Sequence, residues 1–280
     1  FSATELVNIA RIEGGAGDDQ ISGSQGDDVI EGGGGADRLW GNGGNDLFRV
    51  TGDSGPDTVN GGDGFDEIRG SDGDDVIRFT LYTGANTVER IDGGAGNNRI
   101  ASGAWFGNMD FSATELVNIA RIEGGAGDDQ ISGSQGDDVI SGGTGADRIA
   151  GGRGNDTYIL GRGDGMDTVI ENDATAGNTD IAQFLSGVSA EQLWFQKVGN
   201  NLETSIIGTA DKLVIKDWYL GSAYHVEQFQ TTDGAQTLLD SNVQNLVNAM
   251  ASFAPPAAGQ TTLPQTYQDA LAGVIAANWQ

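Results

Sequence analysis

Aspartate recurs on a nine-residue period in this sequence, and glycines precede it in most repeats. The repeats run from Gly14 and again from Gly124, both opening with GGAGDDQIS, and twelve of them occur in all. Glycines at repeat positions one, two and four allow the backbone to curl, so that successive carbonyl oxygens converge. Carbonyls with carboxylates form an all-oxygen shell, which suits Ca²⁺ with its six to eight ligands better than Mg²⁺ or Zn²⁺.

The sixth residue is aspartate in every repeat, and the sequence predicts that it binds the metal. Aspartate and glycine are also common in simple turns. That interpretation fails because about one large apolar residue per nine cannot offset roughly 1–2 kcal/mol of backbone ordering per residue. The predicted ligands are Asp19, Asp28, Asp37, Asp46, Asp57, Asp66, Asp75, Asp129, Asp138, Asp147, Asp156 and Asp167.

The eighth residue of every repeat is apolar, from Ile21 in the first to Val169 in the last. A short strand after each loop would point this side chain inward. Two repeats then form one coil of loop, strand, loop and strand, so that each loop stacks on its second neighbour. The seven loops of the first run offer five such pairs and the five of the second run offer three. Placing one ion in each pair predicts about eight Ca²⁺ ions.

The pattern GGxGxDxUx, with U a large apolar residue, resembles that of the repeats-in-toxin (RTX) family of haemolysin-type calcium-binding proteins. The resemblance implies a mainly β fold: a right-handed parallel β-roll in two blocks with a C-terminal α+β capping domain. It also implies carbonyl donors at positions one and three and a contribution from position five. The residues predicted at positions one and five are Gly14, Gly23, Gly32, Gly41, Gly124, Gly133, Gly142 and Gly151, with Asp18, Asp27, Asn45, Asp74, Asp128, Asp137 and Asn155.

The chain divides by composition into five predicted segments. Residues 1–13 form an N-terminal edge, 14–78 a first roll block, 79–123 a degenerate bridge, 124–170 a second block and 171–280 a cap. Residues 1–30 are repeated without a mismatch at 111–140. In the bridge, Glu89 and Asn98 replace the aspartate, so we expect weak or absent calcium binding there.

The C-terminal segment lacks the period. QLWFQKV, LETSIIG and KLVIKDWY predict strands, and 240–253 and 265–279 predict helices. The resemblance implies that this segment caps the roll and carries a type I secretion signal. His225, the only histidine, lies in AYHVEQF, a predicted strand, where a structural role is favoured over a catalytic one. Neither HExxH nor GxSxG occurs, so we expect no enzyme activity in this chain.

A formal net charge of −27 argues against nucleic acid or an anionic membrane as a partner. No apolar run reaches the roughly 18 residues of a membrane span, and the absence of cysteine excludes disulfides and thiolate sites. The chain begins with Phe1, which indicates a piece of a longer polypeptide or a removed start. A monomer is expected.

The predicted function is calcium-triggered folding that supports type I secretion of a larger toxin or adhesin. The predicted location is outside the cell or on the surface of a Gram-negative bacterium. Two alternatives stay open from the sequence. The chain could be the C-terminal part of a secreted protease or lipase whose catalytic domain is missing from this sequence. It could instead itself bind ice or sugar.

Overall fold

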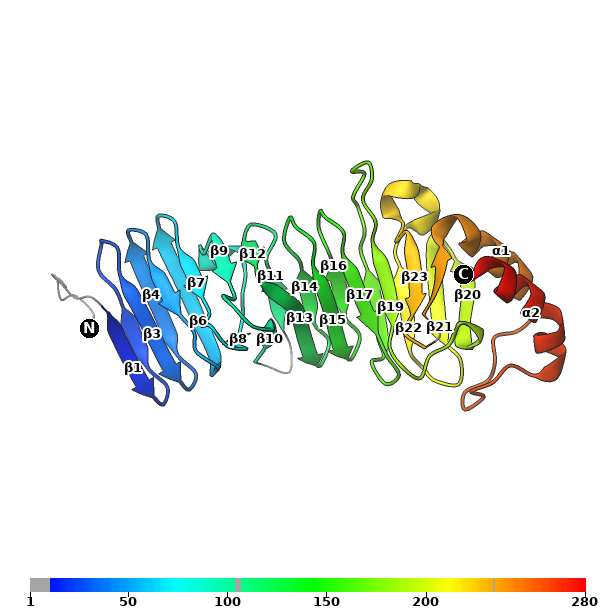
Figure 1. Ribbon diagram of the computed structural model, residues 1–280, viewed down its shortest axis with the longest axis horizontal. Helices are drawn as coiled ribbons and strands as arrows, with labels where there is room; N and C mark the ends of the chain where they lie inside the picture. The colour runs from blue at the N-terminus through cyan, green and yellow to red at the C-terminus, as the bar shows by residue number, and fades with distance from the viewer. Residues whose placement is uncertain (1–10, 104–106, 234) are drawn as a thin grey trace. The chain divides into compact units, whose positions relative to one another are not determined.

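The structure is a computed structural model that describes residues 11–103, 107–233 and 235–280. The chain forms two compact units, 1–138 and 139–280. Figure 1 labels the strands and helices along the chain. Most of the predicted N-terminal edge, residues 1–13, lies outside the described residues. No helix in the described ranges has the length and apolar character needed to cross a membrane.

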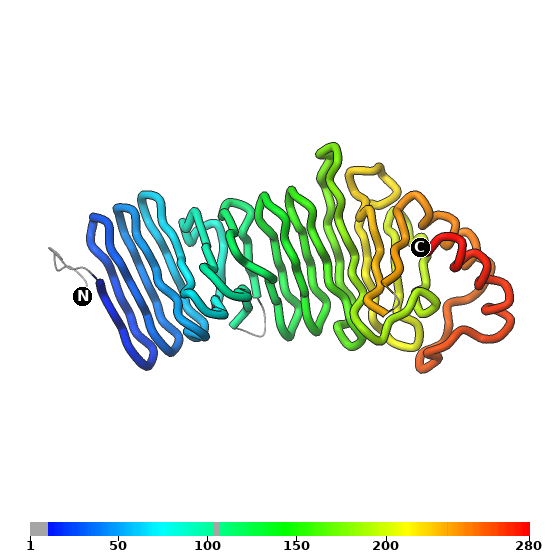
Figure 2. The backbone as a smooth tube through the Cα atoms, in the orientation of Figure 1, coloured from blue at the N-terminus to red at the C-terminus, as the bar shows by residue number. Residues whose placement is uncertain are grey.

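The first unit is a stack of coils in which successive strands alternate between two parallel sheets (Figure 2). One sheet has the order β1-β3-β5-β7-β9-β12 and the other contains β2-β4-β6-β8-β10-β13, with β11 and β14 as a further parallel pair. The bounds are β1 Ile12–Ala16, β2 Gln20–Ser22, β3 Val29–Gly34, β4 Arg38–Gly43, β5 Leu47–Arg49, β6 Asp53–Asp63, β7 Glu67–Arg69, β8 Val76–Phe79, β9 Arg90–Asp92, β10 Asn98–Ser102, β11 Asn108–Asp110, β12 Glu115–Val117, β13 Ile119–Ala126 and β14 Gln130–Ser132, with a 3₁₀ helix at Gly84–Asn86.

The second unit begins as the same kind of roll and ends as an α+β cap. Parallel pairing runs β15-β17-β19-β23 on one side and β16-β18-β22 on the other, after which β24, β21 and β20 add antiparallel strands. The bounds are β15 Val139–Thr144, β16 Arg148–Ala150, β17 Thr157–Leu160, β18 Met166–Val169, β19 Ile181–Phe184, β20 Leu193–Val198, β21 Asn201–Ile206, β22 Lys212–Ile215, β23 Gln228–Thr231, β24 Gln236–Leu239, α1 Asp240–Met250 and α2 Gln265–Asn278; three 3₁₀ helices lie at Ala190–Gln192, Trp218–Leu220 and Ser222–Tyr224.

The apolar residue at repeat position eight forms the core, as the sequence predicts. All twelve of these side chains are buried, and Ile30, Ile68, Ile140 and Val169 have no exposed surface. In β3 and β7 the residues on either side of this side chain are partly or fully exposed, because successive side chains point to opposite faces. The predicted mainly β fold, a parallel roll with a helical C-terminal part, is therefore confirmed.

The predicted bridge continues both sheets of the first unit. β9 pairs with β7, and β10 pairs with β8. Its core holds an aromatic cluster of Phe79, Tyr82 and Phe111, with the rings of Tyr82 and Phe111 stacked at 4.8 Å. The Tyr82 hydroxyl lies 3.0 Å from Thr114 Oγ1, which satisfies its polar end inside the core.

Candidate metal centres in the repeat loops

The position-six aspartates form a ladder along each edge of the first roll. The backbone N–H of Asp19 donates to Asp37 Oδ1 at 2.8 Å, and the N–H of Asp37 donates to Asp57 Oδ1 at 3.0 Å. On the other edge, Asp28 donates to Asp46 and Asp46 to Asp66, both at 2.8 Å. Each loop is thus tied to its second neighbour, which is the stacking that the period predicts.

In several position-six aspartates the second carboxylate oxygen is buried and has no hydrogen-bond partner. This holds for Oδ2 of Asp37, Asp46 and Asp66, and for the same atom of Asp19 and Asp167. An ionised carboxylate that is withdrawn from water without compensation is strongly unfavourable. A hard cation at these oxygens removes that cost, so the buried Oδ2 atoms fit Ca²⁺.

Glycine leaves the space that these oxygens and the neighbouring carbonyls occupy. A Cβ on Gly32 would overlap Asp37 Oδ2 in the same loop, and a Cβ on Gly33 would overlap the carbonyl oxygen of Gly15 in the loop before. Gly33 also has a φ of 100°, which side chains rarely adopt. Positions one and two therefore bring carboxylate and carbonyl oxygens close together, as a calcium site requires.

Position five forms a second ladder that runs in the opposite direction. Asp18 Oδ1 accepts from the N–H of Ala36 at 2.9 Å, and Asp27 Oδ1 accepts from the N–H of Asn45 at 2.7 Å. Asn45, Asp74 and Asn155 accept in the same way from later residues. All seven predicted position-five residues are exposed. Metal binding by them stays a prediction, while their hydrogen bonds already link the loops.

Burial and stacking of like charges raise the pKa of carboxyl groups in this ladder. Burial raises the pKa of Asp46 to about 6, and the carboxylates of Asp66 and Asp28 add to the effect, while the N–H of Asp28 opposes it. Burial likewise raises the pKa of Asp57 to about 7, with a further contribution from Asp37. The ladder is consequently a row of groups that a cation would stabilise in the charged form.

The bridge keeps this ladder with other residue types. Asp66 N–H donates to Glu89 Oε2 at 2.8 Å, and Asp75 N–H donates to Asn98 Oδ1 at 2.9 Å. Both replacements are followed two residues later by a buried isoleucine, Ile91 or Ile100. Glu89 supplies a charge at the ladder position and Asn98 a neutral oxygen. Weak or absent binding there stays a prediction.

The cap adds two ladder residues, Asp180 and Glu227, and one further carboxylate that binds loop amides, Asp211; the nine-residue period could not identify them. Asp156 N–H donates to Asp180 Oδ1 and Asp180 N–H donates to Glu227 Oε2, both at 2.8 Å. On the other side, Asp211 accepts from the N–H groups of Gly163 and Gly165 at 2.9 and 3.1 Å. Asp180, Asp211 and Glu227 each stand two residues before a buried apolar residue, which is the spacing of positions six and eight. That short pattern is the signal that could have found them.

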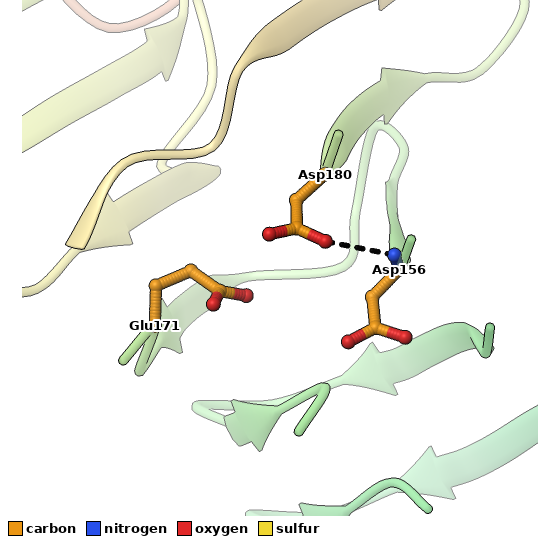
Figure 3. A group of neighbouring side chains, drawn as sticks. All are labelled: Asp156, Glu171 and Asp180. Carbon is orange, nitrogen blue, oxygen red and sulfur yellow. Dashed lines mark hydrogen bonds between the residues drawn. The ribbon is translucent and has the colours of Figure 1, made fainter. Parts of the chain in front are cut away.

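Three buried carboxylates meet where the second roll joins the cap (Figure 3). One carboxylate oxygen from each of Asp156, Glu171 and Asp180 lies within 4.8 Å of the others. Burial, followed by the charge of Asp180, raises the pKa of Glu171 to about 8, and the Tyr158 hydroxyl donates to Glu171 Oε1. The group has the oxygen donors and charge that suit a divalent cation.

The structure brings together most of the predicted loop pairs. Besides the four ladder contacts of the first roll, Gly52 N–H donates to Asp75 Oδ1 at 2.5 Å, which joins the loops at 52 and 70. In the second unit Asp147 N–H donates to Asp167 Oδ1 at 3.2 Å. The predicted pairs 124/142 and 133/151 would each combine a loop before the division at Asp138 with a loop after it. These two pairs stay predictions. Eleven of the twelve position-six aspartates are buried, and Asp19 is half-buried.

Sequence comparison identifies the family to which these loops belong. The family model described as RTX calcium-binding nonapeptide repeat (4 copies) matches residues 13–48, 51–79, 83–104, 123–158 and 132–167. The chain is an RTX repeat protein. A second model, the haemolysin-type calcium binding protein related domain, matches residues 201–236 in the cap. The RTX loops are thus calcium-binding repeats, and the match at 83–104 lies within the bridge.

One solved structure is similar to this RTX chain over part of its length. The crystal structure of extracellular lipase LipA from Serratia marcescens matches with 17% sequence identity and a TM-score of 0.22. The match covers 70% of this chain and 37% of the lipase chain. This RTX chain therefore spans little more than a third of that protein.

His225 has a structural environment in the cap. Its ring stacks on Trp218 at 3.9 Å, Nδ1 lies 3.0 Å from Asp240 Oδ2, and Nε2 lies 3.1 Å from the Trp218 carbonyl oxygen. The strand predicted for AYHVEQF is wrong at the histidine, because His225 lies between a 3₁₀ helix and β23. The stacking and the two polar contacts hold the ring against the cap.

Proposed function

We propose that this RTX module folds by binding Ca²⁺ outside the cell and thereby supports type I secretion of a larger protein. The observation that carries the proposal is the set of buried, unpartnered Oδ2 atoms of Asp37, Asp46 and Asp66 on stacked loops. Carboxylates placed in this way oppose folding when no cation is present. Binding energy is then folding energy, as in other metal-dependent small folds.

The position-six aspartates would hold the ions together with carbonyl oxygens of the adjacent loop, such as that of Gly15. Bound calcium supplies the positive charge that keeps stacked carboxylates ionised inside the roll. We propose about eight ions, one for each predicted loop pair, since each pair offers one set of stacked oxygen donors. The module acts as a monomer and performs no catalysis itself.

The link to secretion follows from calcium affinity and location. Extracellular calcium modules bind with dissociation constants of about 10⁻⁴–10⁻³ M. Cytosolic calcium is scarce, so the repeats stay unfolded and exportable there, and they fill on reaching the outside. Folding outside the cell then opposes movement of the chain back into the cytosol. The C-terminal segment serves as the cap and carries the export signal.

Circular dichroism in EGTA, in millimolar Ca²⁺ and in millimolar Mg²⁺ tests the folding proposal. We expect cooperative gain of β-structure with Ca²⁺ and little gain with Mg²⁺, which requires near-octahedral geometry. An identical spectrum in EGTA and Ca²⁺ would refute calcium-driven folding. Equilibrium dialysis then counts the ions, and a count of two or fewer would exclude the stacked-loop arrangement.

A further inference from the structure

Three repeat loops carry serine at position two, where most of the other loops carry glycine. These loops are 23–28, 70–75 and 133–138, with Ser24, Ser71 and Ser134. The first and third belong to the duplicated segment, and the second has an independent sequence, GSDGDD. The same change in two sequence contexts allows its structural effect to be separated from that of its neighbours.

In each of these loops the serine binds the carboxylate oxygen that is unpartnered in Asp37, Asp46 and Asp66. Ser24 donates to Asp28 Oδ2 from its N–H at 2.6 Å and from its Oγ at 2.9 Å. Ser71 makes the same two bonds to Asp75 Oδ2, at 2.5 and 2.9 Å. The distances from Ser134 to Asp138 Oδ2 are 2.6 and 2.9 Å.

The backbone of the serine loops also differs at position four. In the loops at 14, 32 and 41 this glycine has a left-handed φ of 100°, 133° and 102°. Gly26, Gly73 and Gly136 lie outside that range, and each donates its N–H to the serine Oγ at 3.1–3.2 Å. Serine thus closes a small hydrogen-bonded ring inside the loop, and we call this arrangement the serine latch.

We propose that the serine latch sets calcium affinity, so that the chain carries a tight class of open loops and a weak class of latched loops. The inference rests on the proposed binding of calcium by the loops. An open loop presents Oδ2 of Asp37 or Asp46 directly, whereas a latched loop must first give up two hydrogen bonds to its carboxylate. Loss of one hydrogen bond to a charged group lowers affinity by about tenfold or more.

The two classes give a stepwise response to calcium. Open loops fill and build most of the roll at low concentration, while the loops at Ser24, Ser71 and Ser134 stay latched. The latched loops fill only at calcium concentrations about tenfold or more higher, because their carboxylates must first release the serine. The residue at position two therefore tunes the concentration at which each part of the roll becomes fully metal-bound.

The test compares Ser24→Gly/Ser71→Gly with the unchanged full-length chain by calcium equilibrium dialysis and calorimetric titration. A second variant, Ser24→Ala/Ser71→Ala, removes only the hydroxyl bond and avoids added backbone freedom if the glycine variant folds poorly. The matched control is Ser132→Gly/Ser141→Gly, which removes two serines of the strands at position nine.

We expect the unchanged chain to show a weak class at least about tenfold above the tight class, and the glycine variant to move sites from the weak to the tight class. The alanine variant should move them part of the way, and the control should leave them in place. A single affinity class in the unchanged chain, or weak sites unaffected by both loop variants, would overturn the serine latch while leaving calcium binding intact. Absence of calcium binding in every variant would overturn the proposed function itself.

Discussion

The repeat loops of the first unit and the segment after residue 170 bury different chemistry. The loops bury one apolar side chain per repeat together with carboxylates such as Asp46 and Asp66. The C-terminal segment buries Trp194, Phe195 and Phe229, with Leu246 and Ile275 from its two helices. Apolar burial offsets the entropy of ordering in the cap, whereas the proposed calcium binding would offset it in the roll. The two regions should therefore respond differently to the same perturbations.

Removing calcium should separate the two regions most clearly. In EGTA we expect the backbone amides of 14–78 to exchange with solvent at nearly unfolded rates, because their buried carboxylates lose the cation. Amides in β20, β21 and α1 should stay protected by the apolar core. Hydrogen–deuterium exchange measured by mass spectrometry resolves both regions in one sample. Equal loss of protection in the two would contradict this division.

Leu246→Ala should destabilise the cap with or without calcium. Leu246 is 1% exposed in α1, and replacing a buried leucine by alanine costs about 2–5 kcal/mol. The free energy of unfolding of the cap, obtained from urea titration followed by Trp fluorescence, should fall by this amount in both EGTA and Ca²⁺. Gln244→Ala, on the exposed side of α1, serves as the control and should have little effect. A loss confined to EGTA would show that the cap also relies on calcium.

Asp46→Asn should weaken the roll only when calcium is present. Asparagine keeps an oxygen for the N–H of Asp28 and removes the charge, so the change isolates the metal-binding contribution. We expect a calcium midpoint for folding that is raised several-fold, and a loss of about 1–3 kcal/mol in the free energy of unfolding. Asp63→Asn makes the same charge change at an exposed position. Equal effects of the two variants would mean that total charge matters and ladder position does not.

Acidification should partly replace calcium in the roll. Burial raises the pKa of Asp46 to about 6 and of Asp57 to about 7, above the ordinary aspartate value of 3.8. Between the ordinary and the raised values the folded state binds more protons than the unfolded state, so its stability falls as pH rises. In EGTA, circular dichroism should show more β-structure at pH 5 than at pH 7.5. The same amount at both pH values would disprove the pKa assignment.

Most features of the fold and of the site that the sequence predicts follow from the nine-residue repeat. Position six and position eight are two residues apart in every loop, so the repeat pattern alone assigns Asp37 to the ladder and Leu39 to the core. The helices α1 and α2 were predicted within a few residues because their capping and linker residues are local signals. A short sequence pattern that is repeated many times predicts the fold well, even though a single copy of it would be weak evidence.

The ladder residues of the cap could not be predicted from the period. Asp180 and Glu227 reach the ladder because β19 pairs in parallel with β17 and β23 pairs in parallel with β19. The connections between these strands differ in length. The reversed bonds of position five and the serine latch also depend on backbone conformation, which the repeat pattern alone does not specify. Long-range pairing, rather than composition, decides these positions.

The aromatic cluster of Phe79, Tyr82 and Phe111 solves a problem that uniform loops create. Since neighbouring loops offer the same donors and acceptors, sliding one stack past another by a whole coil would preserve the ladder and leave the alignment undefined. The stacked rings of Tyr82 and Phe111, with the Tyr82 hydroxyl against Thr114, differ in kind from the single aliphatic residue that a consensus repeat contributes. They fit together in one arrangement, so the bridge fixes the register of the stacked loops.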